Sequence, residues 1–258
     1  QLRQQLAELQ GHEVDDGAVL VLDNASGEVL AWVGSGGAGA AGEVDAVLAR
    51  RQPGSTLKPF IYALAFERRL LTPASLLDDA PAQYVDRGAG GSSGGAWSPR
   101  NYNQRHVGWV SVRSALGASL NVSAVKTAAL VGNDALFERL TALGLQPSRS
   151  AGHHGRALAL GSADTSLLAL TNAYRTLANG GIASAPRWLP GDEAAASMRR
   201  VVAADAGSRQ RVVAADAGSR YRVVAADAAW LVADILADNG ARARSFGLDS
   251  ALATRGFA

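Results

Sequence analysis

The hydrophobic pattern begins with a short helix and a hairpin. Three leucines at helical spacing predict a packing or linker helix within residues 1–16. Two apolar runs, 18–22 and 29–33, then flank the turn-forming sequence Asn-Ala-Ser-Gly at 24–27, which predicts a β-hairpin. Because both runs are apolar throughout, we expect the hairpin to be covered on both faces.

Helical patterns dominate the rest of the chain. Residues 55–71 predict a helix that opens at Ser55, after a Pro-Gly break, and ends at Thr72-Pro73. Further helices are predicted over 110–130, 133–143, 163–179 and the segment AAWLVADILADN. The Gly- and Ser-rich residues 86–96 predict a flexible loop.

An 11-residue sequence is duplicated in the C-terminal part of the chain. RVVAADAGSRQ at 200–210 is followed by RVVAADAGSRY at 211–221, and the same start recurs at 222. A solenoid needs more units than this, and Gly-Ser interrupts each copy. We therefore predict a surface insertion at about 200–221.

Composition narrows the class of protein. With 48% hydrophobic and 19% charged residues, the 258-residue chain is typical of a globular protein with a real core. A net charge of +2 without a Lys/Arg run gives no indication of nucleic-acid binding. The absence of cysteine excludes thiol catalysis, disulfides and cysteine metal sites, and we expect no cofactor. No apolar run approaches the roughly 20 residues of a membrane span.

Two tetrapeptides of the form S-x-x-K could carry a nucleophile and its base. Lys58 and Lys126 are the only lysines among 25 basic residues, and they follow Ser55 and Ser123 by three positions. Residues i and i+3 share a helix face, so either pair could meet. Only Ser55 follows a Pro-Gly break, at a helix start whose free N–H groups would stabilise an oxyanion. Ser55 is therefore the candidate nucleophile, with Lys58 as its base.

The histidines offer no alternative base. No G-x-S-x-G is present, and His12, His106, His153 and His154 lack a recognisable triad setting. We expect the adjacent pair to be solvated. A lysine base must lose its proton near neutral pH, and burial would lower its pKa in that direction.

A second element, Ser119-Leu120-Asn121, has the form S-x-N. Its serine could relay a proton to a leaving group, and its asparagine amide could hold Lys58 and a substrate carbonyl. Alone, the tripeptide is equally consistent with polar residues at a helix start. S-x-x-K, S-D-N and K-T-G together are the signature of penicillin-binding proteins and class A β-lactamases.

Longer stretches resemble the transpeptidase domain of class A penicillin-binding proteins, with the penicillin-binding protein 1C branch as the nearest. They are VLVLDNASGEVLAWVGS, GSTLKPFIYALAFE, SPRNYNQRHVGWVSVRSALGASLNVSAVK and ALGSADTSLLALTNAYRTLANGG, which cover about residues 17–185 in the family's order. The tail AAWLVADILADNGARARSFGLDSALATRGFA is similar to the family as well. We therefore expect residues 17–258 to be a partial penicillin-binding transpeptidase domain that carries the repeat as an insertion.

The resemblance implies a fold and a reaction. The fold is α+β, with a five-stranded antiparallel sheet against a helical region, as in serine β-lactamases and D,D-transpeptidases. Ser55 would attack the carbonyl between the terminal D-alanines of a peptidoglycan stem peptide, and an amine of a neighbouring stem peptide would resolve the acyl-enzyme. Lys58 would be the base, with Ser119 and Asn121 in relay and positioning roles, and β-lactams would acylate the same serine. The family implies the periplasmic side of the inner membrane, with a membrane anchor and a glycosyltransferase domain upstream.

One family motif is missing from this sequence. K-T-G lines the site in the family and supplies an oxyanion N–H, but neither lysine here precedes Thr-Gly, and Lys126-Thr127-Ala128 lies in a helical segment. The resemblance implies that K-T-G follows a tail like SFGLDSALATRGFA, where this sequence stops. We therefore expect an incomplete sheet and a weakened catalyst. Two other functions stay open: a non-catalytic module that binds peptidoglycan or a partner protein, and a β-lactamase-type hydrolase.

Overall fold

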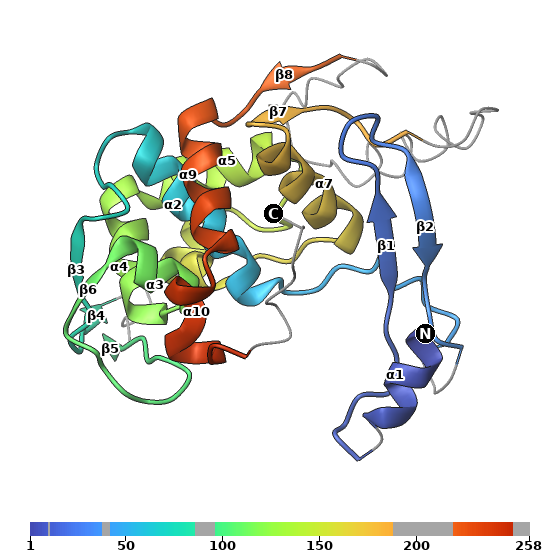
Figure 1. Cartoon of the computed structure of the whole chain (residues 1–258), viewed down its shortest axis with the longest axis horizontal. Helices are drawn as coiled ribbons and strands as arrows, with labels where there is room; N and C mark the ends of the chain where they lie inside the picture. Colours follow the sequence, from blue (N-terminus) through green and yellow to red (C-terminus); the bar gives the residue numbers. More distant parts are fainter. Residues whose placement is uncertain (10, 38–41, 86–95, 188–218, 250–258) are drawn as a thin grey trace.

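The computed structural model describes residues 1–9, 11–37, 42–85, 96–187 and 219–249. The loop predicted at 86–96 and the repeat insertion predicted at about 200–221 lie outside these residues, except for Ala96 and residues 219–221. Figure 1 shows most helices gathered on one side, with a hairpin and the N-terminal helix standing at the other.

The described residues form helices and short antiparallel strand pairs (Figure 1). The helices are α1 (Leu2–Glu8), η1 (Gly54–Leu57, 3₁₀), α2 (Lys58–Glu67), α3 (Val112–Gly117), α4 (Asn121–Val131), α5 (Asn133–Ala142), α6 (Ala151–His154), η2 (Gly155–Leu160, 3₁₀), α7 (Leu167–Ala178), α9 (Ala226–Ala237) and α10 (Asn239–Phe246). The strands are β1 (Val19–Leu22), β2 (Val29–Val33), β3 (Leu76–Asp78), β4 (Tyr84–Val85), β5 (Ala96–Trp97), β6 (Trp109–Ser111), β7 (Ile182–Ala183) and β8 (Tyr221–Arg222). They pair as β1–β2, β3–β6, β4–β5 and β7–β8, so the described residues form antiparallel ribbons of two strands and no larger sheet. This mixture of helices and antiparallel strands agrees with the predicted α+β class.

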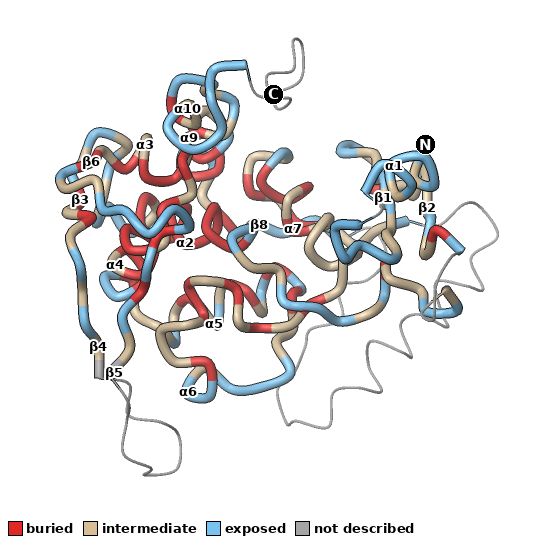
Figure 2. The backbone as a smooth tube through the Cα atoms, turned by 90° about the horizontal axis from the view of Figure 1, so that it is seen from below, coloured by how far each residue is buried: buried red, intermediate tan, exposed pale blue. Residues whose placement is uncertain are grey.

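The predicted hairpin forms from β1 and β2. Gly27 closes its turn with φ +80, a left-handed conformation that glycine adopts without strain. Helix α7 packs on β1. The expectation that both faces are covered is wrong, because Leu30 is 64% and Val21 42% exposed. A two-stranded ribbon that packs against one helix leaves its other face uncovered. Figure 2 shows the residues of the hairpin as mostly intermediate or exposed.

Helix α2 is the centre of the core. Every side chain from Lys58 to Phe66 is buried, and α3, α4, α5 and α9 pack around the helix (Figure 2). A helix that is apolar on every side is stable only when other elements surround it. Lys58 is the exception in this apolar sequence, so packing of the core places an ionisable amine in the interior.

Helix α2 ends earlier than the sequence predicts. The prediction placed its end near residue 71, but the helix stops at Glu67. Arg69 takes φ +55, and the Leu70 N–H bonds back to the Ala65 carbonyl, which turns the chain out of the helix. Glu67 itself is held by a two-bond ion pair with Arg139 of α5.

The helix predicted over 110–130 is two helices. Strand β6 occupies its beginning, and the Ser111 hydroxyl accepts the Ser114 N–H and so caps α3. The chain then breaks at residues 118–120 before α4 starts at Asn121. The other predicted helices form as α5, α7 and α9. No helix of the described residues has the length and hydrophobicity to cross a membrane.

Candidate active site

Ser55 stands on the turn that leads into helix α2. Gly54 takes φ +59 after Pro53, so the chain turns sharply just before the serine. Ser55 lies in η1, close to the first residue of α2, and its side chain is exposed. The sequence therefore located it correctly at a helix start, although its hydroxyl does not cap the helix.

Two side chains hold the turn that presents Ser55. Thr56 Oγ1 donates a hydrogen bond to the Pro53 carbonyl at 2.7 Å. Tyr174 OH, from α7, donates to the Thr56 carbonyl at 2.8 Å, and its ring packs edge-on against Phe60 with centroids 5.3 Å apart. Sequence reasoning did not single out Tyr174, because a hydrogen bond across 118 positions leaves no local pattern.

Lys58 connects the two predicted motifs. Its side chain is 1% exposed, and Nζ donates to the Ser119 carbonyl at 2.5 Å, to Ser119 Oγ at 3.0 Å and to Asn121 Oδ1 at 2.7 Å. The lysine of S-x-x-K thus meets both polar residues of S-x-N. The structure brings together three of the four residues that the sequence nominates.

Burial changes the acid–base behaviour of Lys58. Removing the ammonium group from water lowers the pKa of Lys58 from 10.5 to about 8. A sizeable fraction of the amine is therefore neutral slightly above neutral pH. This is the property that a lysine base requires.

The Ser119 backbone is strained. Its φ of +56 is unusual for a residue with a Cβ, and it occurs at the junction of α3 and α4. In this conformation both the carbonyl and the hydroxyl of Ser119 contact Lys58 Nζ. The strain therefore coincides with the point at which the second motif meets the lysine.

Among the residues that the structure describes, the side chains of Ser55 and Lys58 are not hydrogen-bonded to each other, although the backbone N–H of Lys58 donates to the Ser55 carbonyl. The Ser55 hydroxyl has no hydrogen-bond partner among those residues. A protonated lysine has three N–H donors, and those of Lys58 contact Ser119 and Asn121. Contact with Ser55 therefore requires a change at the amine.

The second S-x-x-K tetrapeptide has a structural role. Ser123 is buried inside α4 and donates to Asp79 Oδ1 at 3.0 Å. Lys126 Nζ donates to the Asp78 carbonyl and lies 3.8 Å from the Asp78 carboxylate. Both side chains thus tie α4 to the chain beside β3, and Ser55 remains the only serine of the two in an exposed position.

A comparison with known families covers most of the chain. Residues 17–249 match the family described as the penicillin binding protein transpeptidase domain. This chain belongs to that family. The match contains all four candidate residues and extends on both sides of the repeat.

Curated relatives carry the name penicillin-binding protein 1A. The protein from Neisseria flavescens is 34% identical over 165 residues, which is 64% of this chain and 20% of the relative. The protein from Rickettsia felis is also 34% identical, over 167 residues with the same coverage. The chain thus spans about a fifth of the length of these relatives. The nearer likeness to the 1C branch stays a prediction.

Solved structures show the same fold. The crystal structure of penicillin-binding protein 1A from Haemophilus influenzae matches with a TM-score of 0.59 and 31% identity, over 67% of this chain and 25% of that chain. A structure described as a peptidoglycan glycosyltransferase from Burkholderia ambifaria matches with a TM-score of 0.65 over 92% of this chain and 70% of that chain. Its identity of 20% supports the fold alone. The transpeptidase fold inferred from the sequence is confirmed.

The described contacts of the histidines in this transpeptidase domain do not include Ser55. His153 is exposed, but His154 is buried, contrary to the expectation that both are solvated. Its helix α6 packs against α5 and η2, and this burial lowers the pKa of His154. His154 Nδ1 lies 3.2 Å from Ser162 Oγ, and His106 Nδ1 lies 2.8 Å from the Asp79 carbonyl oxygen. Within the described structure no histidine is bonded to Ser55.

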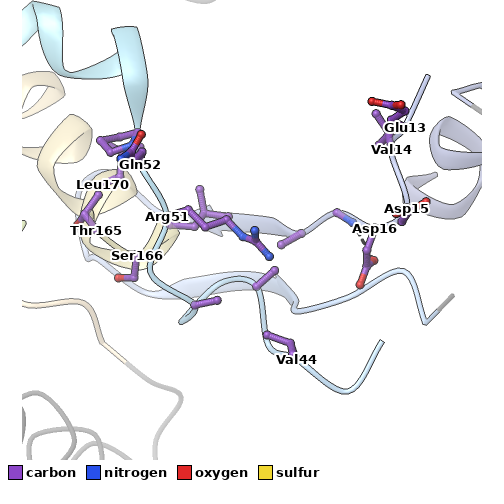
Figure 3. A pocket seen from close by; sticks show the side chains of 16 residues that line it. Glu13, Val14, Asp15, Asp16, Val44, Arg51, Gln52, Thr165, Ser166 and Leu170 are labelled. Atoms are coloured by element: carbon purple, nitrogen blue, oxygen red, sulfur yellow. Dashed lines mark hydrogen bonds between the residues drawn. The ribbon is translucent and has the colours of Figure 1, made fainter. Parts of the chain in front are cut away.

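A pocket of about 600 Å³ lies beside the hairpin, next to the Ser55 turn (Figure 3). Residues 13–18 line one wall, residues 165–167 and 170 another, and Arg51, Gln52 and Pro53 reach it from the turn. Figure 3 shows Arg51 extending into the pocket toward the wall that carries Asp16. The four candidate residues are not in its lining, so this pocket borders the site and does not contain it.

Proposed function

We propose that this domain is a serine-type D,D-transpeptidase that cross-links peptidoglycan stem peptides through an acyl-enzyme on Ser55. One observation carries the proposal: buried Lys58 bonds to both Ser119 and Asn121, which lie 61 and 63 positions away in sequence. Membership of the penicillin-binding transpeptidase family supports the same reaction. β-Lactams, which resemble the terminal D-Ala-D-Ala, are the expected covalent inhibitors.

Acylation begins with neutral Lys58. A deprotonated amine gains a lone pair, so Nζ accepts the proton of the Ser55 hydroxyl once it gives up one of its present contacts. Ser55 Oγ then bonds to the carbonyl carbon between the two D-alanines. The Lys58 N–H already donates to the Ser55 carbonyl and Pro59 has no N–H, so the backbone N–H of Ser55 itself, in the first turn of η1, stabilises the resulting oxyanion.

Ser119 carries the proton onward. Protonated Lys58 donates to Ser119 Oγ, and the Ser119 hydroxyl passes a proton to the amine of the departing D-alanine as the C–N bond breaks. The ester on Ser55 remains. Asn121 holds Lys58 in place and presents its amide toward the substrate backbone.

A second stem peptide completes the reaction. Its amine attacks the ester carbonyl and loses a proton to neutral Lys58, and Ser55 Oγ leaves and regains a proton. One amide bond has then replaced another, and no cofactor is required. We infer that this takes place in the cell envelope, on the periplasmic side of the inner membrane, with a membrane anchor and a glycosyltransferase domain in the upstream part of the protein.

Labelling with a fluorescent penicillin tests the proposal. The purified chain should form a covalent adduct that survives denaturing electrophoresis, and peptide mass spectrometry should place it on Ser55. Ser55→Ala should abolish the adduct. Ser123→Ala is the control for the identity of the labelled serine: it removes the serine of the other S-x-x-K tetrapeptide, and the adduct should still form on Ser55. Its labelling rate is not compared, because Ser123 donates to Asp79.

The absence of K-T-G affects the expected rate. Loss of one oxyanion donor typically slows a reaction by about 10²–10³. We therefore propose that labelling of this chain is slow and becomes faster in a longer chain that includes a K-T-G strand. If neither chain forms an adduct on Ser55, the catalytic proposal is wrong.

A non-catalytic binding module is the second candidate. The missing hydrogen bond between the Ser55 and Lys58 side chains favours it. Such a module would bind D-Ala-D-Ala peptides in a titration but would form no adduct with penicillin. A β-lactamase-type hydrolase would instead release hydrolysed penicillin with many turnovers per Ser55.

A further inference from the structure

We propose that Asn101 is a positioning residue for this site: buried Asp79 orients its side chain, and Asn101 in turn holds the Ser-Leu-Asn segment against Lys58. The proposal deepens the transpeptidase function and rests on it for the effect on rate. The positioning itself depends on hydrogen bonds alone.

Asn101 caps helix α4 from a distant part of the chain. The residue at the N-cap position, Leu120, has no polar side chain, so the first N–H groups of the helix need another acceptor. Asn101 is 3% exposed, and its Oδ1 accepts the N–H of Asn121 at 2.8 Å and that of Val122 at 3.3 Å. The start of α4, and with it Asn121, is therefore placed by Asn101.

The amide of Asn101 has a determined orientation. Its Nδ2 donates to Asp79 Oδ2 at 2.6 Å and to the Arg105 carbonyl at 2.9 Å. Both donors and both acceptor positions of the amide are thus in use. A flipped amide would set its NH₂ group against the N–H groups of α4 and its oxygen against a carboxylate.

Asp79 is a carboxylate with no exposed surface. It accepts hydrogen bonds from Asn101 Nδ2, from Ser123 Oγ at 3.0 Å and from the Val107 N–H at 3.2 Å. Among the described residues it forms no salt bridge, so neutral donors stabilise its charge. This costly buried group is best explained by its effect on the orientation of the groups that surround it.

The same segment also holds the Asn121 side chain. Asn121 Nδ2 donates to the Arg100 carbonyl at 2.7 Å, which leaves Oδ1 free to accept from Lys58 Nζ at 2.7 Å. Residues 100 and 101 therefore contact Asn121 at its amide and its backbone. A chain of hydrogen bonds leads from Asp79 through Asn101 and Asn121 to Lys58.

The small number of lysines makes this chain of contacts measurable. Lys58 and Lys126 are the only two, so protein labelled with ¹³C at lysine Cε should give two side-chain NMR signals. A pH titration follows the protonation of Lys58 directly, without substrate, and the Lys126 signal reports whether a variant is folded.

We expect Asn101→Ala to lower the titration midpoint of Lys58 by about one pH unit, because displacement of Asn121 removes a hydrogen bond to the ammonium form. Asn121→Ala should give a similar shift. In the double variant the shift should be no larger than in Asn121→Ala alone, because Asn101 acts through Asn121. Asp79→Asn keeps the shape of the side chain and should also lower the titration midpoint of Lys58. It replaces Asn101→Ala in this test if that variant does not fold.

Asn103→Ala is the matched control. Asn103 is exposed in the same segment and accepts the Arg105 N–H at 3.0 Å, without contact to Asn121. The titration midpoint of Lys58 in Asn103→Ala should equal that in the wild type. The proposal is overturned if Asn101→Ala and Asp79→Asn leave the midpoint of Lys58 unchanged, or if the shift of Asn101→Ala is fully retained in the absence of the Asn121 amide.

The rate of penicillin acylation is measured in parallel. A displaced base typically slows such a reaction by about 10- to 100-fold, so Asn101→Ala should label more slowly than Asn103→Ala by that factor. Equal labelling rates for the two variants would overturn the role of Asn101 in the reaction. If the wild type is not acylated at all, the proposed function fails, while the titration still decides the positioning role.

Discussion

Gly161 packs directly against Gly54, the residue before Ser55. A Cβ at position 161 would lie 2.2 Å from the Gly54 carbonyl oxygen and 2.3 Å from its nitrogen. Gly161 also takes φ +80, so it needs glycine both for its conformation and for its contact. This close approach of two backbones joins the end of η2 to the turn that presents the candidate nucleophile.

Gly161→Ala should therefore disturb the Ser55 turn. Gly144→Ala is the control, because Gly144 has φ +86 but open space around its Cα. Gly144→Ala should cost about 1–2 kcal/mol for the left-handed backbone, and Gly161→Ala about 1–3 kcal/mol more for the clash. Thermal unfolding measures both, and labelling with penicillin should fall only for Gly161→Ala. Equal stability of the two variants would contradict the contact.

The two candidate serines should differ in their contributions to stability. Ser55 is exposed without a hydrogen-bond partner in the described structure, so Ser55→Ala should change the free energy of unfolding by less than about 0.5 kcal/mol. Ser123→Ala leaves the buried Asp79 carboxylate short of a donor and should cost about 1–3 kcal/mol. Urea denaturation compares them. A larger loss for Ser55→Ala would mean that its hydroxyl has a structural role.

Two substitutions at Ser119 distinguish the effect of its strained backbone on stability from the effect of its hydroxyl on acylation. Both Ser119→Gly and Ser119→Ala remove the hydroxyl that contacts Lys58, so both should slow acylation by similar factors. At φ +56 glycine is relaxed and alanine is not, and Ser119→Gly should therefore be the more stable by about 1 kcal/mol. Denaturation and labelling of the two proteins test this. Recovery of acylation in Ser119→Gly would show that the hydroxyl is dispensable.

The free energy of unfolding should depend on pH through Lys58. Its pKa is about 8 when folded, against 10.5 as an ordinary value, so between these pH values the unfolded chain holds a proton that the folded chain has released. The contribution of Lys58 to the free energy of unfolding therefore rises with pH across that window by up to about 3 kcal/mol. Below about pH 8 burial of the charged amine destabilises the folded chain by this full amount. Relative to Lys58→Met, the wild type should gain stability from pH 8 to 10.5. A constant difference would show that Lys58 is not shifted.

The same pKa should govern acylation. Only neutral Lys58 can take the Ser55 proton, so the rate of penicillin labelling should rise with pH and level off above about pH 8. Labelling reactions that are quenched at fixed times across pH 6–9.5 measure how the acylation rate depends on pH. A rate that falls over this range would exclude Lys58 as the base.

Local patterns predicted what depends on neighbours in sequence. The hairpin follows from its apolar runs and its Asn-Ala-Ser-Gly turn, and the start of the α2 region follows from the Pro-Gly break before Ser55. Local context also distinguished the two S-x-x-K tetrapeptides as candidates, because Ser123 lies inside a helix and Ser55 lies at a helix start. These features could be predicted because they depend on residues that are two to four positions apart in the sequence.

Other features had no such signal. The break at Ser119 went unpredicted because serine rarely takes a positive φ, and only the surrounding contacts hold it there. The burial of His154 depends on how α6 packs, and Tyr174 acts on Thr56 across the fold. The sequence pattern around each of these residues resembles that of many unstrained, solvated or purely structural positions.

The sequence by itself determined the family, the nucleophile candidate, its neighbouring lysine and the S-x-N partner, because each is a pattern within a few residues. Tertiary structure alone decided that Lys58 is buried, that it contacts Ser119 and Asn121, and that Asp79 and Asn101 place Asn121. The physical reason is packing: a pKa and a network of hydrogen bonds depend on which distant segments exclude water around a group. Composition and spacing carry no record of that arrangement.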